Sequence, residues 1–198
     1  ANHVNVKGIR LKIKLKAMYE RLKGKILLKV EDSGRAFYLH PQKEEGYFLG
    51  RPQDAFKVMR EQGVGISNSD LEKIPVGISS VSGEDTDGDG LPDLMEDAIG
   101  TDKTKADTDG DGYSDKQELS AGYNPNGNGR ILNDTNFTGK HLGKIFLQVE
   151  GSGEAWYIYD AKRFYLGRPA DAFQLMRELS LGISNTDFET LGDEEEED

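Results

Sequence analysis

Apolar and polar residues alternate in several short stretches of this chain, which is typical of strands with one buried face. The stretch KILLKVE (25–31) would place Ile26, Leu28 and Val30 on the same face. The same alternation recurs in KIFLQVE (144–150). Serine-glycine pairs follow both stretches and predict turns into a second strand, AFYL in the first case and AWYI in the second.

These strands belong to a long internal repeat. GKILLKVEDSGRAFY (24–38) matches GKIFLQVEGSGEAWY (143–157), and YFLGRPQDAFKVMREQGVGISNSDLE (47–72) matches FYLGRPADAFQLMRELSLGISNTDFE (164–189). Each copy predicts a three-stranded antiparallel meander followed by a helix that begins at Arg-Pro, because proline suits the first helical position. One such unit is very small, so we expect each copy to pack against another part of the chain, the other copy included.

The predicted helix of the first copy carries an apolar stripe at Ala55, Phe56 and Met59. Gly63 and Gly65 are expected to end it. A short final helix is expected after it in each copy. In each copy a glutamate follows a serine or threonine by three residues, Ser69 with Glu72 and Thr186 with Glu189, which predicts a capping box for each of these helices.

The stretch GIRLKIKLK (8–16) alternates strictly and predicts a further strand with a basic face. Residues 1–30 carry nine lysines or arginines against one acidic residue, Glu20. Two main interpretations stay open. The stretch is either an edge strand whose lysines are solvated and discourage aggregation, or a strand that pairs with a neighbouring subunit. A role at a membrane surface is a third.

Composition limits the class of protein. Of 198 residues, 35% are apolar and 31% charged, so the core is expected to be modest and divided among small units. The net charge of −11 argues against a general nucleic-acid binder. The absence of cysteine excludes disulfides and cysteine metal sites. No stretch is long and apolar enough to predict a membrane span.

Most of the negative charge lies in one place. Residues 84–118 hold thirteen carboxylates against three lysines, and such a cluster repels itself unless something neutralises it. Residues 85–106 align with 107–128 at a 22-residue period. Calcium prefers about six to eight oxygen ligands, and a twelve-residue loop supplies them from positions 1, 3, 5, 7, 9 and 12, with glycine at 6. Both copies fit this pattern, with Gly90 and Gly112 at position 6.

The pattern therefore predicts at least two Ca²⁺ ions. The predicted ligands of the first loop are Asp85, Asp87, Asp89, the Leu91 carbonyl, Asp93 (directly or through water) and Glu96. Those of the second loop are Asp107, Asp109, Asp111, the Tyr113 carbonyl, Asp115 and Glu118.

Only a short helix is predicted after each loop, in LPDLMEDAIG and YSDKQELSAG, and the serines and glycines of GISSVSGE make a poor helix before the first. The two loops therefore resemble thrombospondin type 3 repeats, which are half EF-hands along an irregular chain. The resemblance covers about 45 residues of 198. It implies a structural role for calcium and further oxygens from Asp102 and Asn124.

Dockerins also pair two calcium loops. Their recognition residues are usually small and hydroxyl-bearing, whereas Leu94-Met95 and Lys116-Gln117 stand at those positions here. A dockerin-like binding module stays as an alternative. The flanking copies, on LQVEGSGEAWY and YLGRPADAF, resemble repeats of bacterial secreted or surface proteins, which implies a location and no activity.

No catalytic residue is predicted. The sequence has no motif of a nucleophile elbow, a P-loop or a zinc protease, and His40 aligns with Tyr159 of the second copy. His3 falls in a predicted tail, and His141 is the third histidine. The repeated arginines at 51 and 168 are expected to pair with nearby carboxylates, and the repeated aspartates at 54 and 171 to stabilise the first turn of a helix.

The predicted fold class is α+β, with two related modules joined by a calcium-loop connector of little regular structure. The predicted function is a secreted, non-enzymatic structural protein in which Ca²⁺ makes the connector rigid. Extracellular calcium is abundant enough for low-affinity sites, which favours a location outside the cell. The predicted segments are a basic N-terminal segment (1–23), module A (24–80), the calcium loops (81–129), module B (130–192) and an acidic tail (193–198).

The partner is predicted from the unlike charges of the two ends. A basic first strand and an acidic tail suggest a head-to-tail contact between copies, giving a filament, tube or surface layer. The alternative is a monomeric adhesin or a wall- or glycan-binding fragment of a larger surface protein. Its glycan ligands would stack on aromatic residues of the strands, at least half of which should be core.

Overall fold

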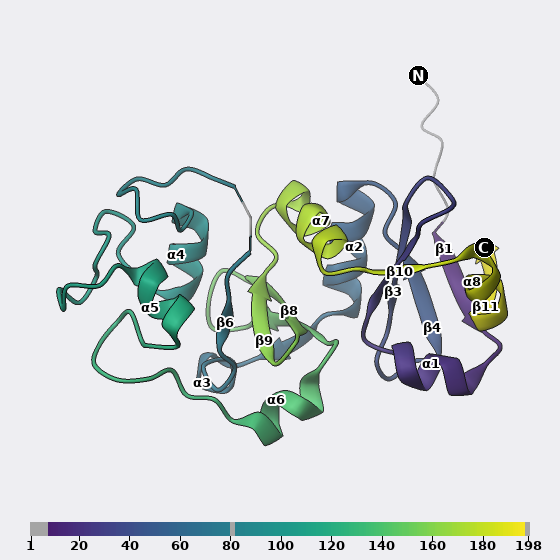
Figure 1. Cartoon of the computed structure of the whole chain (residues 1–198), viewed down its shortest axis with the longest axis horizontal. Coiled ribbons are helices and arrows are strands. Elements are labelled where there is room, and N and C mark those ends of the chain that lie inside the picture. The colour runs from purple at the N-terminus through teal and green to yellow at the C-terminus, as the bar shows by residue number, and fades with distance from the viewer. Residues whose placement is uncertain (1–7, 80–81, 197–198) are drawn as a thin grey trace.

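The computed structural model of the chain describes residues 8–79 and 82–196 (Figure 1). His3, the start of the basic segment, Ser80 and the last two residues of the acidic tail lie outside this range. The helices are α1 (Lys16–Leu22), α2 (Pro52–Gln62), α3 (Asn68–Leu71), α4 (Asp93–Ile99), α5 (Asp115–Ala121), α6 (Thr135–His141), α7 (Pro169–Glu178) and α8 (Asn185–Leu191).

Eleven described strands form two sheets. A six-stranded sheet has the order β10–β2–β3–β4–β1–β11, and a five-stranded sheet has the order β5–β7–β8–β9–β6. The strands of the first are β1 (Ile9–Ile13), β2 (Ile26–Lys29), β3 (Arg35–Leu39), β4 (Glu45–Phe48), β10 (Leu181–Ile183) and β11 (Gly192–Glu196). Those of the second are β5 (Val64–Ile66), β6 (Val76–Gly77), β7 (Ile145–Gln148), β8 (Ala155–Tyr159) and β9 (Lys162–Tyr165). Each predicted meander is present, so the α+β fold class is confirmed.

The two modules exchange their C-terminal parts. Each meander stays in one sheet, but the strands that follow its helix join the other sheet: β5 pairs with β7, and β10 pairs with β2, both in parallel. Helices α2 and α7 pack against each other between the two sheets (Figure 1). The expectation that each copy packs against another part of the chain is met, and that part is the other copy, because each sheet needs strands from both copies.

Two buried tyrosines mark the point where the copies cross. The hydroxyl of Tyr38 donates to the carbonyl of Gly143 at 2.8 Å, and the hydroxyl of Tyr157 donates to the carbonyl of Gly24 at 2.6 Å. Both glycines have positive φ, and a Cβ on Gly24 would lie 2.8 Å from the Cα of Gly143. The two backbones thus meet where only glycine fits.

Carboxylates also reach across between the copies. The side chain of Glu150, just after β7, accepts from the backbone N–H of Asn68, the first residue of α3, at 2.7 Å. Its counterpart Glu31 accepts from the N–H of Asn185, the first residue of α8, at 2.8 Å. The repeated glutamates therefore stabilise the start of a helix that belongs to the other copy.

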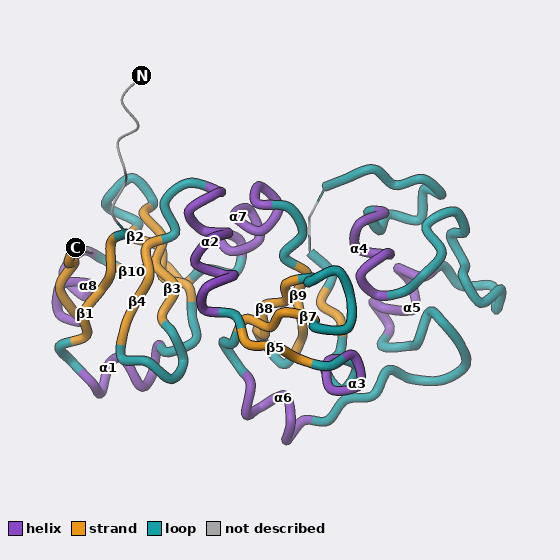
Figure 2. Tube along the Cα trace, turned by 180° about the vertical axis from the view of Figure 1, so that it is seen from behind, coloured by secondary structure: helices purple, strands orange, loops and turns teal. Residues whose placement is uncertain are grey.

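Both faces of the meanders are covered. Ile26 lies in the core between the sheets with Met59 and Leu175, whereas Leu27 on the opposite face lies in a second core with Tyr19 and Phe188 from α1 and α8. The five-stranded sheet is covered similarly by α3 and α6. Figure 2 shows the strands of this sheet between α2 and α7 on one side and α3 and α6 on the other. A clean alternation of buried and exposed residues is therefore not expected in these strands.

Three local predictions were wrong. Val30 and its counterpart Val149 are exposed, because both lie in turns beyond the strands. The predicted capping boxes at Ser69 and Thr186 are absent, since each final helix begins two residues earlier. Ser67 and Ser184 accept there from the N–H of the residue three positions later. Gly63 does end α2, but the glycine two residues on lies in β5.

The basic first strand has an inner position. Strand β1 lies between β4 and β11, and Leu11 is fully buried. Lys12 of this strand and Lys14 just after it pair with the acidic end of the same chain, Lys12 with Glu195 and Lys14 with Asp193. The edge-strand interpretation is therefore wrong for the described residues, and the unlike ends already meet within one chain.

The acidic connector, residues 82–134, is a projection and no spacer. It leaves the five-stranded sheet after β6 and returns to the same sheet through α6 and β7 (Figure 1). A small core attaches it there, in which Leu91, Met95 and Leu119 pack on Val76 of β6. The prediction that the connector fixes the separation of two modules is wrong, because the modules share both sheets.

Candidate calcium centre

The connector contains two loops of the same geometry, each followed by a seven-residue helix, α4 or α5. Each helix ends at a glycine in the left-handed conformation, Gly100 and Gly122, which explains why both glycines recur at the 22-residue period. The residues directly before the two loops, 82–84 and 101–106, are not helical. Both loops are therefore half EF-hands, as the sequence predicts.

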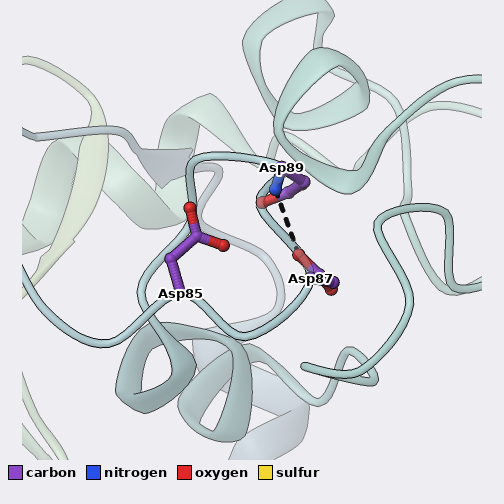
Figure 3. Close-up of side chains that lie close together, drawn as sticks. All are labelled: Asp85, Asp87 and Asp89. Carbon is purple, nitrogen blue, oxygen red and sulfur yellow. Dashed lines mark hydrogen bonds between the residues drawn. The ribbon is translucent and has the colours of Figure 1, made fainter.

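Three aspartates converge in each loop. The carboxylates of Asp85, Asp87 and Asp89 each offer an oxygen, and these oxygens lie within 4.8 Å of one another (Figure 3). The equivalent triad of the second loop is formed by Asp107, Asp109 and Asp111. The structure thus brings together positions 1, 3 and 5 of each predicted ligand set.

Backbone N–H groups hold the first aspartate of each triad. Asp85 accepts from the N–H of Gly88 at 2.9 Å and of Gly90 at 3.0 Å, and Asp107 accepts equivalently from Gly110 and Gly112. All four glycines have positive φ. The glycines at loop positions 4 and 6 therefore turn the backbone toward the carboxylate at position 1.

Position 12 of each loop carries the observation that favours a cation. Glu96 is fully buried and Glu118 nearly so, and the Oε2 atom of each has no hydrogen-bond partner among the described residues. A third buried carboxylate oxygen of the two loops without a partner among the described residues is Oδ2 of Asp87. Buried carboxylate oxygens are costly unless a donor or a metal ion satisfies them.

The charges near these glutamates point the same way. Burial, followed by the negative charges of Asp87 and Asp89, raises the pKa of Glu96 to about 7. Burial, followed by Asp109 and Asp111, raises the pKa of Glu118 to about 7. The negative charges of each triad thus act on the glutamate of the same loop, and a hard divalent cation held by oxygens would compensate both the burial and the repulsion.

Position 9 has a local partner in both loops. The carboxylate of Asp93 accepts from the N–H and the hydroxyl of Thr86, both at 2.8 Å. Asp115, which is fully buried, accepts from the same two groups of Thr108 at 2.9 and 2.7 Å. These bonds tie the end of each loop to its start, and a part for either aspartate in coordination stays a prediction.

The remaining predicted ligands do not belong to the aspartate triads. Leu91 has a buried side chain in the small core, and Tyr113 is exposed, while the bonding of their carbonyls stays a prediction. Asp102 is held by Thr104 and by Lys105, whose Nζ lies 2.9 Å from a carboxylate oxygen. Asn124 accepts from the N–H of residue 126.

A contact between the loops was not predicted. The backbone N–H of Lys116 donates to Asp89 at 2.9 Å, and its Nζ donates to the carbonyl of Gly90 at 2.8 Å. The start of α5 therefore rests on the first loop, and the two loops form one unit. The only signal in the sequence is that Lys116 is the one lysine within either loop.

Comparison with known proteins identifies this unit. Residues 85–105 and 107–126 match the family model of the bacterial TSP3 repeat. The connector contains two bacterial TSP3 repeats. These are calcium-binding structural repeats, and each match covers one of the two loops and the helix that follows it. No curated protein and no solved structure matches the chain.

The TSP3 repeats account for about a fifth of the chain. They project from the two sheets and the helices that cover them (residues 8–79 and 135–196), which we call the shared-sheet body (Figure 1). Within the described residues, no helix has the length and apolar character that crossing a bilayer requires. The repeated arginines pair as predicted, Arg51 with Asp54 and Arg168 with Asp171.

Proposed function

We propose that this chain is an extracellular, non-enzymatic structural protein in which Ca²⁺ orders the TSP3 repeats into a rigid projection on the shared-sheet body. The proposal rests on the two buried glutamate oxygens without partners, one in each loop, together with the aspartate triad of the same loop. Asp85, Asp87, Asp89 and Glu96 would hold one ion, and the equivalent four residues of the second loop another. An ion that binds only the folded state stabilises it by about 3 kcal/mol at a hundredfold excess over Kd.

The experiment is a calorimetric titration of the chain with calcium. The wild type should bind at least two ions. The Glu96→Gln, Glu118→Gln double variant should lose them, since it keeps the shape of both side chains and removes the charge. Asp97→Asn is the matched control, because Asp97 lies on α4 but pairs with Lys103 at 2.9 Å. Equal calcium binding by the wild type and the double variant would refute the proposal.

Two features of the fold support a structural rather than a sensing role. The helices after the loops have seven residues each, and their apolar side chains Met95 and Leu119 are already buried against the five-stranded sheet. A sensor needs an apolar groove that calcium exposes. The location outside the cell follows from the affinity range of such sites and stays part of the proposal.

Self-association is a second candidate, and the position of β1 favours it. In the five-stranded sheet β9 pairs directly with β6, whereas in the six-stranded sheet β1 is inserted between β4 and β11. Without β1, the five-stranded sheet would therefore still be continuous, whereas the six-stranded sheet would have a gap between β4 and β11. A neighbouring chain could place its own β1 in this opening, which would link copies into a filament, tube or surface layer.

Sedimentation velocity separates the two states of β1. Lys12 and Asp193 face each other in register, so Lys12→Cys with Asp193→Cys would lock β1 in its own chain when oxidised. Growth into large species in about 2 mM calcium, by the reduced form and the wild type only, is the expected result. Assembly of the oxidised form would exclude exchange of β1, and a monomer throughout would exclude self-association.

The aromatic side chains of the strands, which a glycan-binding role would use for stacking, pack in or against the cores. Tyr38, Trp156 and Tyr157 are fully buried, and Phe48 and Tyr165 pack at the edges of cores. An adhesin role would need another surface, and the dockerin alternative has no support from the family match.

A further inference from the structure

A cavity of about 290 Å³ lies between the five-stranded sheet and the TSP3 repeats. Val76 and Arg163 line it from the sheet, Ile99 and Leu119 from the ends of α4 and α5, and Arg130 and Leu132 from the returning connector. The cavity combines apolar residues with two arginines, one glutamate (Glu72) and two asparagines (Asn124 and Asn126). Its size is close to the lower limit for small-molecule sites, about 300 Å³.

Arg163 is the unusual member of this lining. It is 8% exposed, and its Nε has no hydrogen-bond partner among the described residues. Its guanidinium carbon lies 4.9 Å from the centre of the Trp156 ring, which stacks on the side chain without neutralising it. Burial lowers the pKa of Arg163 to about 10, and the negative charge of Glu72 opposes that change.

The repeat does not require an arginine here. The equivalent position in the first copy is Gly46, and a Cβ there would lie 2.9 Å from side-chain atoms of Leu11 and Leu39. In the six-stranded sheet, this space is thus filled by apolar side chains, one of them from β1. The second copy therefore has a buried charged side chain, Arg163, at a position where the first copy has only apolar side chains. The fold itself does not require a charge at this position.

A buried guanidinium without a hydrogen-bond partner at Nε is costly, and a planar anion offers it paired N–H···O bonds. Glu72 also lines the cavity and disfavours an ion of higher charge. The walls formed by Val76, Leu119 and Leu132 suit a compact apolar body. We propose that this cavity binds a small monocarboxylate, with Arg163 as the residue that holds its carboxylate.

The single tryptophan of the chain reports on this site, because Trp156 lies against the Arg163 guanidinium. The probe is cyclohexanecarboxylate, titrated into the full chain in calcium while the emission of Trp156 is followed. A saturable shift is expected. Cyclohexanecarboxamide, which has the same body and no charge, should produce none. An equal response to the amide, or no saturable response to the acid, would overturn the proposal.

Variants locate the binding. Arg163→Gln should weaken binding of the acid at least tenfold, and Arg168→Gln, an exposed arginine paired with Asp171, should leave it unchanged. Leu132→Glu tests the site if the first variant does not fold, because Leu132 is 69% exposed and lines the cavity. It should also weaken binding about tenfold by charge repulsion, whereas Val30→Glu, in the turn after β2 of the other sheet, should not. Full binding by Leu132→Glu would overturn the proposal, and so would full binding by a folded Arg163→Gln.

Inorganic phosphate is the competing anion. The negative charge of Glu72 and the apolar residues of the lining predict that phosphate does not displace the carboxylate probe at equal concentration. Displacement by phosphate with the same dependence on Arg163 would show a general anion site and overturn the assignment to a monocarboxylate.

Discussion

The crossing of the two copies at Gly24 and Gly143 makes a strong prediction about stability. Gly143→Ala adds one methyl group at a backbone with φ of +77°, and the new Cβ would overlap the Cα and carbonyl of Gly24. A Cβ is fixed by the backbone and the atoms of Gly24 that it would overlap are backbone atoms, so no side-chain rotation can relieve this overlap. The two copies must move apart at the point where they cross.

The magnitude follows from three contributions. A non-glycine residue in the left-handed conformation costs about 1–2 kcal/mol. Overpacking of a tight core costs about 1–3 kcal/mol. Separation of the copies also weakens the buried bonds from Tyr38 to Gly143 and from Tyr157 to Gly24, each of which contributes about 1 kcal/mol. The expected loss in the free energy of unfolding is about 3–6 kcal/mol, a large part of the roughly 5–15 kcal/mol of a typical domain.

Urea unfolding in calcium measures this loss, and two glycines of the same module serve as controls. Gly153 has φ of +85° with no neighbour closer than 4.0 Å, so Gly153→Ala should show the conformational cost alone, about 1–2 kcal/mol. Gly139 lies inside α6 with open space around it, so Gly139→Ala should stabilise by about 0.5–1 kcal/mol. If Gly143→Ala is no worse than Gly153→Ala, the copies do not cross as described.

Three further predictions concern the same body. His40 is buried and its pKa is lowered to about 4, so the unfolded chain takes up the proton first, and stability should fall as pH drops from about 6.5 to 4. At pH 5, wild type should lose about 2 kcal/mol more than His40→Gln, relative to pH 7.5, in urea unfolding. Proteolysis within residues 84–118 in EDTA should leave two fragments that co-elute on gel filtration, because both sheets contain strands from each fragment; separate elution would contradict the exchange. Glu31→Gln and Glu150→Gln should each cost about 1 kcal/mol in thermal unfolding, and the exposed Glu189→Gln close to nothing.

The meanders and their helices could be predicted from sequence, but the exchange between copies could not. The helix beginning at Arg51-Pro52 carries nearly the same apolar stripe as the one beginning at Arg168-Pro169, so either helix would suit either meander. The short strands β5 and β10 have three residues each with a central glycine, which is too little for a periodic signal. The deciding information is the crossing at Gly24 and Gly143, which no local pattern contains.

The calcium loops were more predictable because their chemistry is local. Carboxylates and glycines at fixed spacing within twelve residues place the triads without reference to the rest of the fold. The burial of Glu96 was not predictable, since it depends on how α4 packs on the five-stranded sheet. Neither was Arg163, whose neighbours Val76 and Leu132 are far away in the chain.

The pairing of β1 with β11 determines how the molecule would respond to tension. Ile9 lies opposite Glu196 and Ile13 opposite Gly192, so the two described ends meet at the same end of an antiparallel pair. A force that pulls these ends apart would open the pair one residue at a time, as a zipper, instead of shearing all its hydrogen bonds together. The TSP3 repeats project at the far end of the molecule, and both arms of the connector join one sheet (Figure 1). They therefore lie outside the line of tension, and the pair of β1 and β11 would open while the calcium unit stays unloaded.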